Sequence, residues 1–206
     1  MLTLYALPYD PNRPTICFDE KSLQLLADSR PSHPMTTKHP KRQDHEYVRH
    51  GTRNLFLFAE PKAGQRHVLV TTHRTKEDFA KALRYLVDAL YPDVTMIDLV
   101  ADNLNTHTAE TVIEIFGKPE ADRILSRITF HYTPLHASWV NIAEIEFSAM
   151  TGQCLDRRIP DEWTLRLELL AWELERNHQA RPVKWSFNWK CARRMFIDKQ
   201  TAAPAK

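Results

Sequence analysis

The stretch Thr15-Ile-Cys-Phe-Asp19 is a short apolar run that ends in a carboxylate, a pattern typical of a strand buried in a sheet. Two more strands are predicted after it, at 46–58 and at 67–72, with a kink or bulge at Gly51. The segment Pro61-Lys-Ala-Gly64 has the composition of a hairpin turn. Because consecutive strands usually pair with each other, this order favours an antiparallel meander of three strands.

The chain beyond this meander alternates between helical and strand patterns. Thr75 and Asp78 give an N-terminal signal for a helix that Pro92 ends. Strands are predicted at 94–100 and 128–132, and helices at 79–90, 108–116, 138–153 and 161–176. This order predicts an α/β fold, in which a mixed five-stranded sheet combines the three-strand meander with two parallel strands and is flanked by helices.

Composition limits the classes of protein to which the chain can belong. Its 206 residues suit one domain, and no apolar run reaches the roughly 18 residues of a membrane span. Three widely spaced cysteines exclude a disulfide scaffold and a paired-cysteine zinc site, and they fit a reducing, cytoplasmic location. Four glycines leave no glycine-rich phosphate loop. With 28 basic and 26 acidic residues, nucleic-acid binding is permitted but not required.

Three acidic residues occupy places that a sheet would bring together. Asp19 ends the first predicted strand and Asp102 ends the fourth, and neighbouring strands lie about 4.8 Å apart. A third carboxylate comes from the helix at 138–153. Two or three carboxylates suffice for Mg²⁺, which prefers oxygen ligands and keeps several waters. Two such ions about 3.5–4 Å apart can activate water and stabilise the leaving oxygen at a phosphodiester.

Each of these choices has a competitor on the same element. Glu144 and Glu146 point about 200° apart on a helix, and Glu144 shares its side with the apolar residues, so we expect Glu144 to face the sheet and Glu146 to face elsewhere. Asp98 lies on the same strand face as Asp102, but in mid-strand, where an unpaired carboxylate is costly. Such a set of carboxylates also arises by chance in α/β proteins, so spacing alone does not establish a metal site.

Four sequence blocks carry a family resemblance. They are Cys17-Phe-Asp-Glu-Lys21, Tyr47-Val-Arg-His-Gly-Thr-Arg-Asn-Leu55, Asp102-Asn-Leu-Asn-Thr-His107 and Tyr132-Thr-Pro-Leu-His-Ala-Ser-Trp-Val-Asn-Ile-Ala-Glu144. Together they resemble the catalytic domain of bacterial insertion-sequence transposases of the mariner superfamily, the DDE transposases, over residues 8–196. The last two blocks are each specific, and their occurrence in this order strengthens the resemblance.

The resemblance implies a ribonuclease H-like fold, with Asp19, Asp102 and Glu144 as the catalytic and metal-binding triad. It also implies two Mg²⁺ ions, for which Mn²⁺ can substitute, and double-stranded DNA as partner, both transposon ends and target. We expect a lead-in at 1–14, a DDE catalytic domain at 15–196 and a frayed tail at 197–206. The protein should be cytoplasmic and bacterial, associated with the nucleoid when on DNA, and should have no membrane partner.

Two features depart from the family pattern. Glu144 follows Asp102 by 42 positions, which is wider than is typical of the superfamily, and we expect the extra residues in the connection at 117–127. Relatives begin with helix-turn-helix modules, and none is readable before Asp19. We therefore expect the catalytic part alone, with a second copy of itself or a separate DNA-binding transposase part as alternative partners.

Residues near the triad are candidates for supporting it. We predict this role for Asn103, Asn105, His107 and Asn141. For the first three of these, contact with DNA phosphate is the alternative. The stripe of Leu167, Leu170 and Leu174 on the last helix is predicted to be core, with a dimer surface as the alternative.

Candidate DNA contacts come from two segments. The polar, proline-rich loop predicted at 29–44 and the strand after it carry basic residues that either follow a phosphate backbone or are simply solvated. The basic candidates are Lys38, Lys41, Arg42, Arg49 and Arg53. His136 and Trp139 flank the approach to Glu144, where Trp139 either stacks on a base or anchors the helix start from a buried position.

These inferences predict a Mg²⁺-dependent DNA transposase domain. Water activated between two ions would cleave a strand at the transposon end, and the freed 3′-hydroxyl would then attack target DNA. One alternative is a plain nuclease of the same fold, which hydrolyses DNA without strand transfer. The other is a non-catalytic remnant that binds DNA or full-length transposase subunits.

Overall fold

The computed structural model describes residues 2–40, 42–104, 107–134, 137–187 and 191. Its centre is a five-stranded sheet with the strand order β3-β2-β1-β4-β5. The strands are β1 (Thr15–Asp28), β2 (Tyr47–Glu60), β3 (Gln65–Thr71), β4 (Ile97–Ala101) and β5 (Ile128–Tyr132). β1, β2 and β3 pair antiparallel, whereas β1, β4 and β5 are parallel. The predicted sheet of a three-strand meander plus two parallel strands is confirmed.

The central strands are apolar on both faces, so the sheet has two cores. Cys17, Leu55 and Leu57 are fully buried on one face, and Phe18 and Phe56 are fully buried on the other. This division follows from the alternation of side chains along a strand. Because both faces are apolar, both must be covered, and the sheet cannot leave one face in water.

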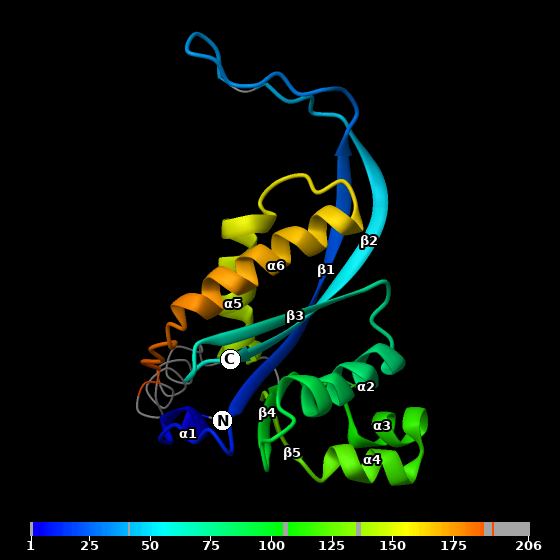
Figure 1. Cartoon of the computed structure of the whole chain (residues 1–206), viewed down its shortest axis with the longest axis vertical. Coiled ribbons are helices and arrows are strands. Elements are labelled where there is room, and N and C mark those ends of the chain that lie inside the picture. The colour runs from blue at the N-terminus through cyan, green and yellow to red at the C-terminus, as the bar shows by residue number, and fades with distance from the viewer. Residues whose placement is uncertain (1, 41, 105–106, 135–136, 188–190, 192–206) are drawn as a thin grey trace, which may run out of the picture.

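Helices cover the two faces in separate groups (Figure 1). One group consists of α5 (Ile142–Met150), α6 (Glu162–Gln179) and the short α1 (Leu2–Ala6), which packs into the same core. The other consists of α2 (Lys76–Tyr85), α3 (Ala109–Phe116) and α4 (Lys118–Leu125). Among the described residues, no helix is long and apolar enough to cross a membrane.

β1 is much longer than predicted. It extends to Asp28 and pairs with β2 well beyond the end of β4, so the two strands rise as an arm to the top of Figure 1. Asp19 therefore lies within β1 and does not end it. The bulge predicted at Gly51 is confirmed by a register shift in the pairing and by its φ of 86°, which favours glycine.

The structure confirms the N-terminal helix signal at Thr75 and Asp78 but divides or adds helices elsewhere. Thr75 and Asp78 form a reciprocal capping box at the start of α2, which continues as a π-helical segment η1 (Leu86–Leu90). The predicted helix at 138–153 is divided into the 3₁₀ segment η2 (Ser138–Val140), α5 and the π-helical segment η3 (Thr151–Leu155). The connection expected at 117–127 contains α4, which was missed because a helix of eight residues has little periodic signal.

α6 protects the open edge of the sheet. β3 is an edge strand, and Asn177 of α6 hydrogen-bonds to both backbone groups of Arg66, accepting from its N at 2.8 Å and donating to its O at 2.7 Å. One turn earlier, Glu173 accepts from the backbone N of Val68 at 2.9 Å. Side chains of α6 therefore take the place of a sixth strand and prevent edge-to-edge pairing there.

Candidate active site

The carboxyl end of β4 meets the middle of β1. The two strands are parallel, with Cys17 opposite Val100. Continuing this register places Asp19 beside Asp102, which directly follows β4. The two carboxylates therefore share one level of the sheet because β4 ends there, although β1 continues past it.

Asn141 fixes the start of α5 against this level. It is fully buried, its Nδ2 donates to the carbonyl oxygen of Phe18 at 2.8 Å, and its Oδ1 accepts from the backbone N of Ala143 at 3.2 Å as the helix N-cap. Phe18 directly precedes Asp19, and Glu144 lies in the first turn of α5. One buried amide thus connects the helix that carries Glu144 to the strand that carries Asp19.

The three carboxylates of Asp19, Asp102 and Glu144 are half-buried. Burial is the main cause that raises the pKa of Asp19 to about 7, and the negative charges of Asp102 and Glu144 act in the same direction. A hydrogen bond from the backbone N of Glu20, at 2.8 Å, opposes this shift. None of the three forms an ion pair with a described lysine, arginine or histidine.

The carboxylate of Asp98, the competitor on β4, is already bound by neighbouring side chains. Its carboxylate accepts two hydrogen bonds from Arg13, at 2.7 and 2.9 Å, and contacts His131 Nε2 at 2.7 Å. Burial would raise the pKa of Asp98, but the hydrogen bonds from Arg13 and His131 outweigh it and lower the pKa. Asp98 thus belongs to a structural ion pair with Arg13.

The carboxylate of Glu146, the competitor on α5, is likewise bound by neighbouring arginines. It is only 2 % exposed, and it accepts from Arg66 at 2.7 and 3.0 Å and from Arg176 at 3.1 Å. Burial would raise the pKa of Glu146, but the hydrogen bonds and charge of Arg66 outweigh it and lower the pKa. Glu146 therefore binds β3 to α6, and of the two glutamates only Glu144 is unpaired among the described residues.

Two residues hold the segment that carries Asp102. Thr133 Oγ1 donates to Asp102 Oδ1 at 3.1 Å, and His107 Nδ1 donates to the carbonyl oxygen of Asp102 at 3.2 Å. The His107 ring is buried and stacks on Phe79 with ring centroids 4.7 Å apart. Thr133 was not predicted from the sequence. The signal available for it was its position directly after β5, the strand that pairs with β4.

Of the other two predicted supporting residues, the structure describes one. Asn103 is exposed, and its side chain makes no hydrogen bond to another described residue. Asn105 lies outside the described residues. Among the predicted supporters that the structure describes, His107 and Asn141 therefore contact the segments carrying the carboxylates, and Asn103 does not.

The donor set suits a hard divalent cation. Within the described ranges, no three His, Cys, Asp or Glu side chains are gathered tightly enough to form a ready-made metal site. Asp102 and Glu144 nevertheless lie close enough to Asp19 to raise its pKa, and all three carboxylates provide only oxygen ligands and are partly open to solvent. Mg²⁺ takes such ligands and keeps several waters, and a cation would offset both the burial of the Asp19 carboxylate and the smaller repulsion from Asp102 and Glu144.

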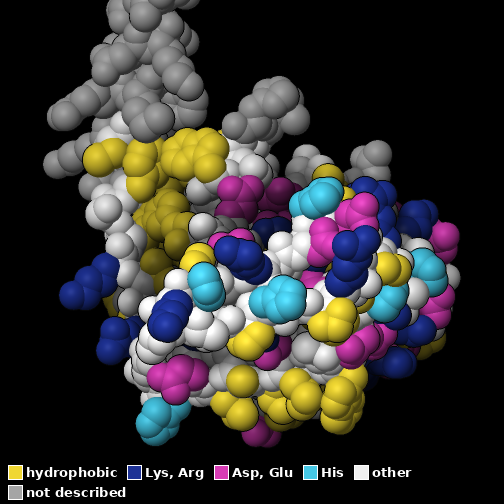
Figure 2. Space-filling model, turned by 90° about the horizontal axis from the view of Figure 1, so that it is seen from above, with side chains coloured by type: hydrophobic (Ala, Val, Ile, Leu, Met, Phe, Trp, Pro, Cys, Tyr) yellow, Lys and Arg dark blue, Asp and Glu magenta, His cyan; other side chains and the backbone are white. Residues whose placement is uncertain are grey.

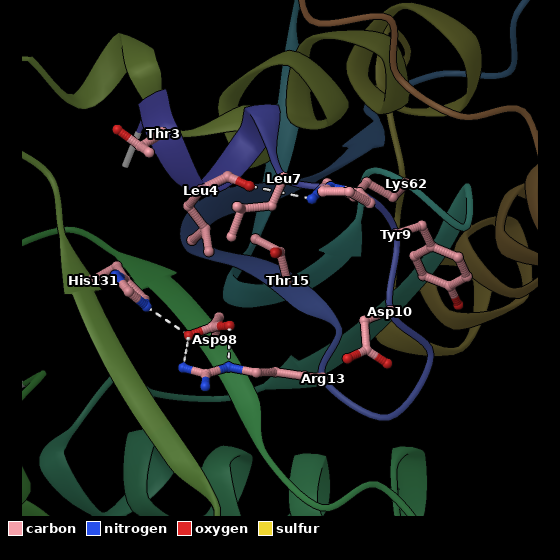
Figure 3. Close-up of a pocket in the computed structure, with 11 residues that line it drawn as sticks. Thr3, Leu4, Leu7, Tyr9, Asp10, Arg13, Thr15, Lys62, Asp98 and His131 are labelled. Carbon is pink, nitrogen blue, oxygen red and sulfur yellow. Dashed lines mark hydrogen bonds and ion pairs between the residues drawn. The ribbon is translucent and has the colours of Figure 1, made fainter.

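A cavity of about 630 Å³ lies at the opposite end of β4, away from the triad. Figure 3 shows Asp98 between Arg13 and His131, with Lys62 pointing toward the carbonyl oxygen of Leu4. The buried carboxylate in this cavity is already neutralised by its neighbours. Volume alone therefore does not identify the candidate active site.

The basic residues predicted to contact DNA differ in availability. Lys38 and Arg42 are exposed at the tip of the arm, and Arg49 is exposed on β2. Arg53 forms an ion pair with Glu162 at 2.5 Å and is half-buried. Figure 2, which looks down on the arm, shows Lys, Arg and His side chains interspersed with Asp and Glu and no continuous basic patch.

Three further candidates complete the predicted set. Lys41 and His136 lie outside the described residues. Trp139, in η2, is 41 % exposed and contacts Phe187 with ring centroids 5.0 Å apart. The alternative that Trp139 is a buried anchor is therefore wrong, and its indole ring is partly open to solvent beside the start of α5.

Comparison with known families identifies the chain. The family described as DDE superfamily endonuclease matches residues 14–166, which is most of the chain. The chain belongs to the DDE superfamily of endonucleases. The match spans the strands β1 to β5, α5 and the carboxylates Asp19, Asp102 and Glu144. The family predicted from the sequence blocks is confirmed.

Solved structures of Mos1 transposase complexes are similar to this chain in fold. The Mos1 mariner paired-end complex with Mn aligns with a TM-score of 0.56 and 15 % identity, covering 87 % of this chain and 54 % of the Mos1 chain. The Mos1 strand transfer complex gives a TM-score of 0.57 at 15 % identity, over 87 % and 53 % of the two chains. The Mos1 paired-end complex with Mg gives 0.53 at 12 % identity, over 100 % and 60 %.

These alignments confirm the predicted ribonuclease H-like fold. The DDE domain described here spans about half the length of the Mos1 chains that it matches. Among curated protein sequences, none matches it.

Proposed function

We propose that this DDE domain catalyses divalent-metal-dependent cleavage and strand transfer of DNA as the catalytic part of a transposase. The observation that carries the proposal is the set of half-buried carboxylates of Asp19, Asp102 and Glu144, which is unpaired with any described cation. Membership of the DDE endonucleases supports phosphodiester chemistry at this site. The Mos1 structures of similar fold are paired-end complexes with Mn and with Mg and a strand transfer complex.

Asp19, Asp102 and Glu144 would hold two Mg²⁺ ions, or Mn²⁺ in their place. Such ions supply an activated water and stabilise the leaving oxygen of a phosphodiester. In this proposal the carboxylates position the ions and do not themselves act as general bases. His107 holds the backbone that carries Asp102, and Asn141 holds α5, and so Glu144, against β1.

The proposed DNA contacts are sequence-independent. Lys38, Arg42 and Arg49 are exposed, and none of them is ion-paired with a described residue, so each is available to a phosphate. Arg53 is a weaker candidate because Glu162 already neutralises it. Because contacts with phosphates do not read base edges, binding through these residues should be salt-sensitive and nearly equal for transposon-end and random duplexes.

The test is a cleavage and strand-transfer assay on labelled duplex DNA with Mg²⁺, with Mn²⁺ and with EDTA. We expect metal-dependent products that Asp19→Asn and Glu144→Gln each abolish, while the matched surface variant Asp122→Asn keeps full activity. Cleavage without joined products would support the plain nuclease instead. DNA binding without cleavage under every metal condition would overturn the proposal in favour of a non-catalytic remnant.

A competition titration at fixed salt tests the mode of DNA binding. A random duplex should displace a transposon-end duplex at nearly the same concentration. A preference of about 1,000-fold or more, the lower bound for specific binders, would show that recognition resides in this domain.

A further inference from the structure

α6 carries two apolar stripes on nearly opposite sides. The inner stripe of Leu165, Leu169 and Trp172 packs on the sheet and is at most 6 % exposed. The outer stripe is 47–70 % exposed and consists of Trp163, Leu167, Leu170 and Leu174. Successive helical residues turn by about 100°, which places the two stripes on different sides of the helix. The predicted assignment of this leucine stripe to the core is therefore wrong.

A surface helix of a globular domain needs only one apolar side. Single exposed hydrophobic residues are ordinary, but the outer stripe is continuous, with steps of four, three and four residues over about 16 Å of α6. Its members include Trp163, which is 70 % exposed. A helix that is apolar on two sides indicates a second neighbour in addition to the sheet.

The spacing of the outer stripe, four, three and four residues, is the same in both directions along α6. A two-fold axis midway between residues 168 and 169 would place Trp163 opposite Leu174 of a second helix and Leu167 opposite Leu170. An interface between two identical copies must be complementary to itself in this way. The stripe therefore fits a second copy of α6 that runs antiparallel.

The charges beside the stripe do not oppose such pairing. Glu162 is neutralised by Arg53 at 2.5 Å and by Arg166 at 2.7 Å. On the other flank, Glu168 is paired with Arg157. Two copies could therefore approach without bringing unpaired like charges together at these positions.

We propose that the outer stripe of α6 is the interface of a homodimer in which two copies of α6 pack antiparallel about this axis. This proposal does not depend on the proposed function. A patch of this kind covers about 300–600 Å², whereas a standard interface buries about 800 Å² per partner, so the dimer should dissociate reversibly on dilution. Because the contact is apolar and its flanking charges are paired internally, added salt should not weaken it.

The first test is sedimentation velocity of the full chain over a dilution series. We expect a concentration-dependent dimer that Leu167→Glu with Leu170→Glu converts to monomer, because both charges would lie at the centre of the interface. Ile113→Glu with Met35→Glu, at exposed apolar positions elsewhere, is the matched control and should leave the dimer intact. A monomer at all concentrations, or a dimer that the α6 variant leaves unchanged, would overturn the proposal.

Thermal unfolding of the dilute monomer detects a different occupant of the stripe. The α6 variant should then unfold at the wild-type temperature, because its substitutions lie on an exposed face. A lower unfolding temperature in the monomer would mean that this chain covers its own stripe, and this outcome would also overturn the proposal.

Cysteine cross-linking tests the antiparallel geometry. In a background with Cys154→Ser and Cys191→Ser, a mixture of Leu167→Cys chains and Leu170→Cys chains should form disulfide dimers faster than either chain alone, because these positions face each other. Faster cross-linking of Leu167→Cys chains with one another would indicate a parallel arrangement and overturn the proposed axis.

Discussion

Two elements of this DDE domain each carry a pair of carboxylates, and in each pair the two residues have opposite environments. On β4 and just after it, Asp98 is bound by Arg13, whereas Asp102 has no described cationic partner. On α5, Glu146 is buried against Arg66, whereas Glu144 is half-buried and has no such partner. Carboxylates two or four positions apart in the sequence therefore differ in burial and ion pairing more than carboxylates on different elements do.

The pKa values follow the same division. Arginine partners lower the pKa of Asp98 and of Glu146 despite their burial. At the triad, burial and neighbouring carboxylates raise the pKa of Asp19 to about 7. An arginine partner compensates the cost of burying a charged carboxylate, whereas the charge of Asp19 lies among like charges, an arrangement that would favour a bound cation in the proposed function.

The largest expected effect separates the two aspartates of β4. Asp102→Asn should reduce metal-dependent DNA cleavage by about 1,000-fold, because losing a metal ligand removes several kcal/mol of transition-state stabilisation at 1.36 kcal/mol per tenfold. Asp98→Asn should lower stability but leave the folded fraction active. The measurement is the cleavage rate at equal folded concentration, and the reverse result would mean that the two aspartates have been assigned wrongly.

The second prediction separates the two glutamates of α5. Glu146→Ala should lower the free energy of unfolding by about 3–5 kcal/mol, because Arg66, which is 1 % exposed, would be left as an uncompensated buried charge. Glu144→Ala, two residues earlier, should change it by no more than about 0.5 kcal/mol. Urea unfolding of both variants decides this, and equal losses would contradict the comparison.

The third prediction concerns pH in the presence of EDTA. Because the pKa of Asp19 is raised in the folded state, the folded protein binds this proton more tightly than the unfolded chain, and stability should fall as pH rises from 5 to 7. The contribution of Asp19 to this slope has an upper limit of about 1.4 kcal/mol per pH unit. Asp19→Asn should flatten the curve by that amount.

Glu146 and Asp98 should act in the opposite direction. Their pKa values are lowered in the folded state, so their stabilisation should be lost only as pH falls below the usual carboxyl pKa of about 4. Loss of stability on acidification in the range of pH 5 to 7, unchanged in Asp19→Asn, would contradict the raised pKa of Asp19.

The smallest expected effect concerns the link between the triad elements. Asn141→Ala should cost about 1–2 kcal/mol, because it removes both the N-cap of α5 and the hydrogen bond to the carbonyl oxygen of Phe18. Asn141→Asp keeps an N-cap acceptor but cannot donate to Phe18 when ionised. Denaturation and cleavage assays should therefore show better stability for the Asp variant than for the Ala variant, with impaired activity in both.

Local sequence signals account for much of this fold. The apolar runs at 15–19 and 54–59 required a sheet covered on both faces, and Thr75 with Asp78 placed the start of α2. These features depend on residues close together in the chain, so periodicity and capping rules reach them. The same rules could not give the length of β1. Its outer half is held by pairing with β2, which lies on the far side of an intervening polar segment in the sequence.

The sequence by itself determined that five strands occur, their order along the chain, and three candidate carboxylates. Only the tertiary structure decided that Arg66 pairs with Glu146, 80 positions away, that Arg13 pairs with Asp98, 85 positions away, and that Thr133 contacts Asp102. It also decided which stripe of α6 faces the sheet. The reason is that burial, ion pairing and pKa shifts depend on which distant elements meet, and no local spacing contains that information.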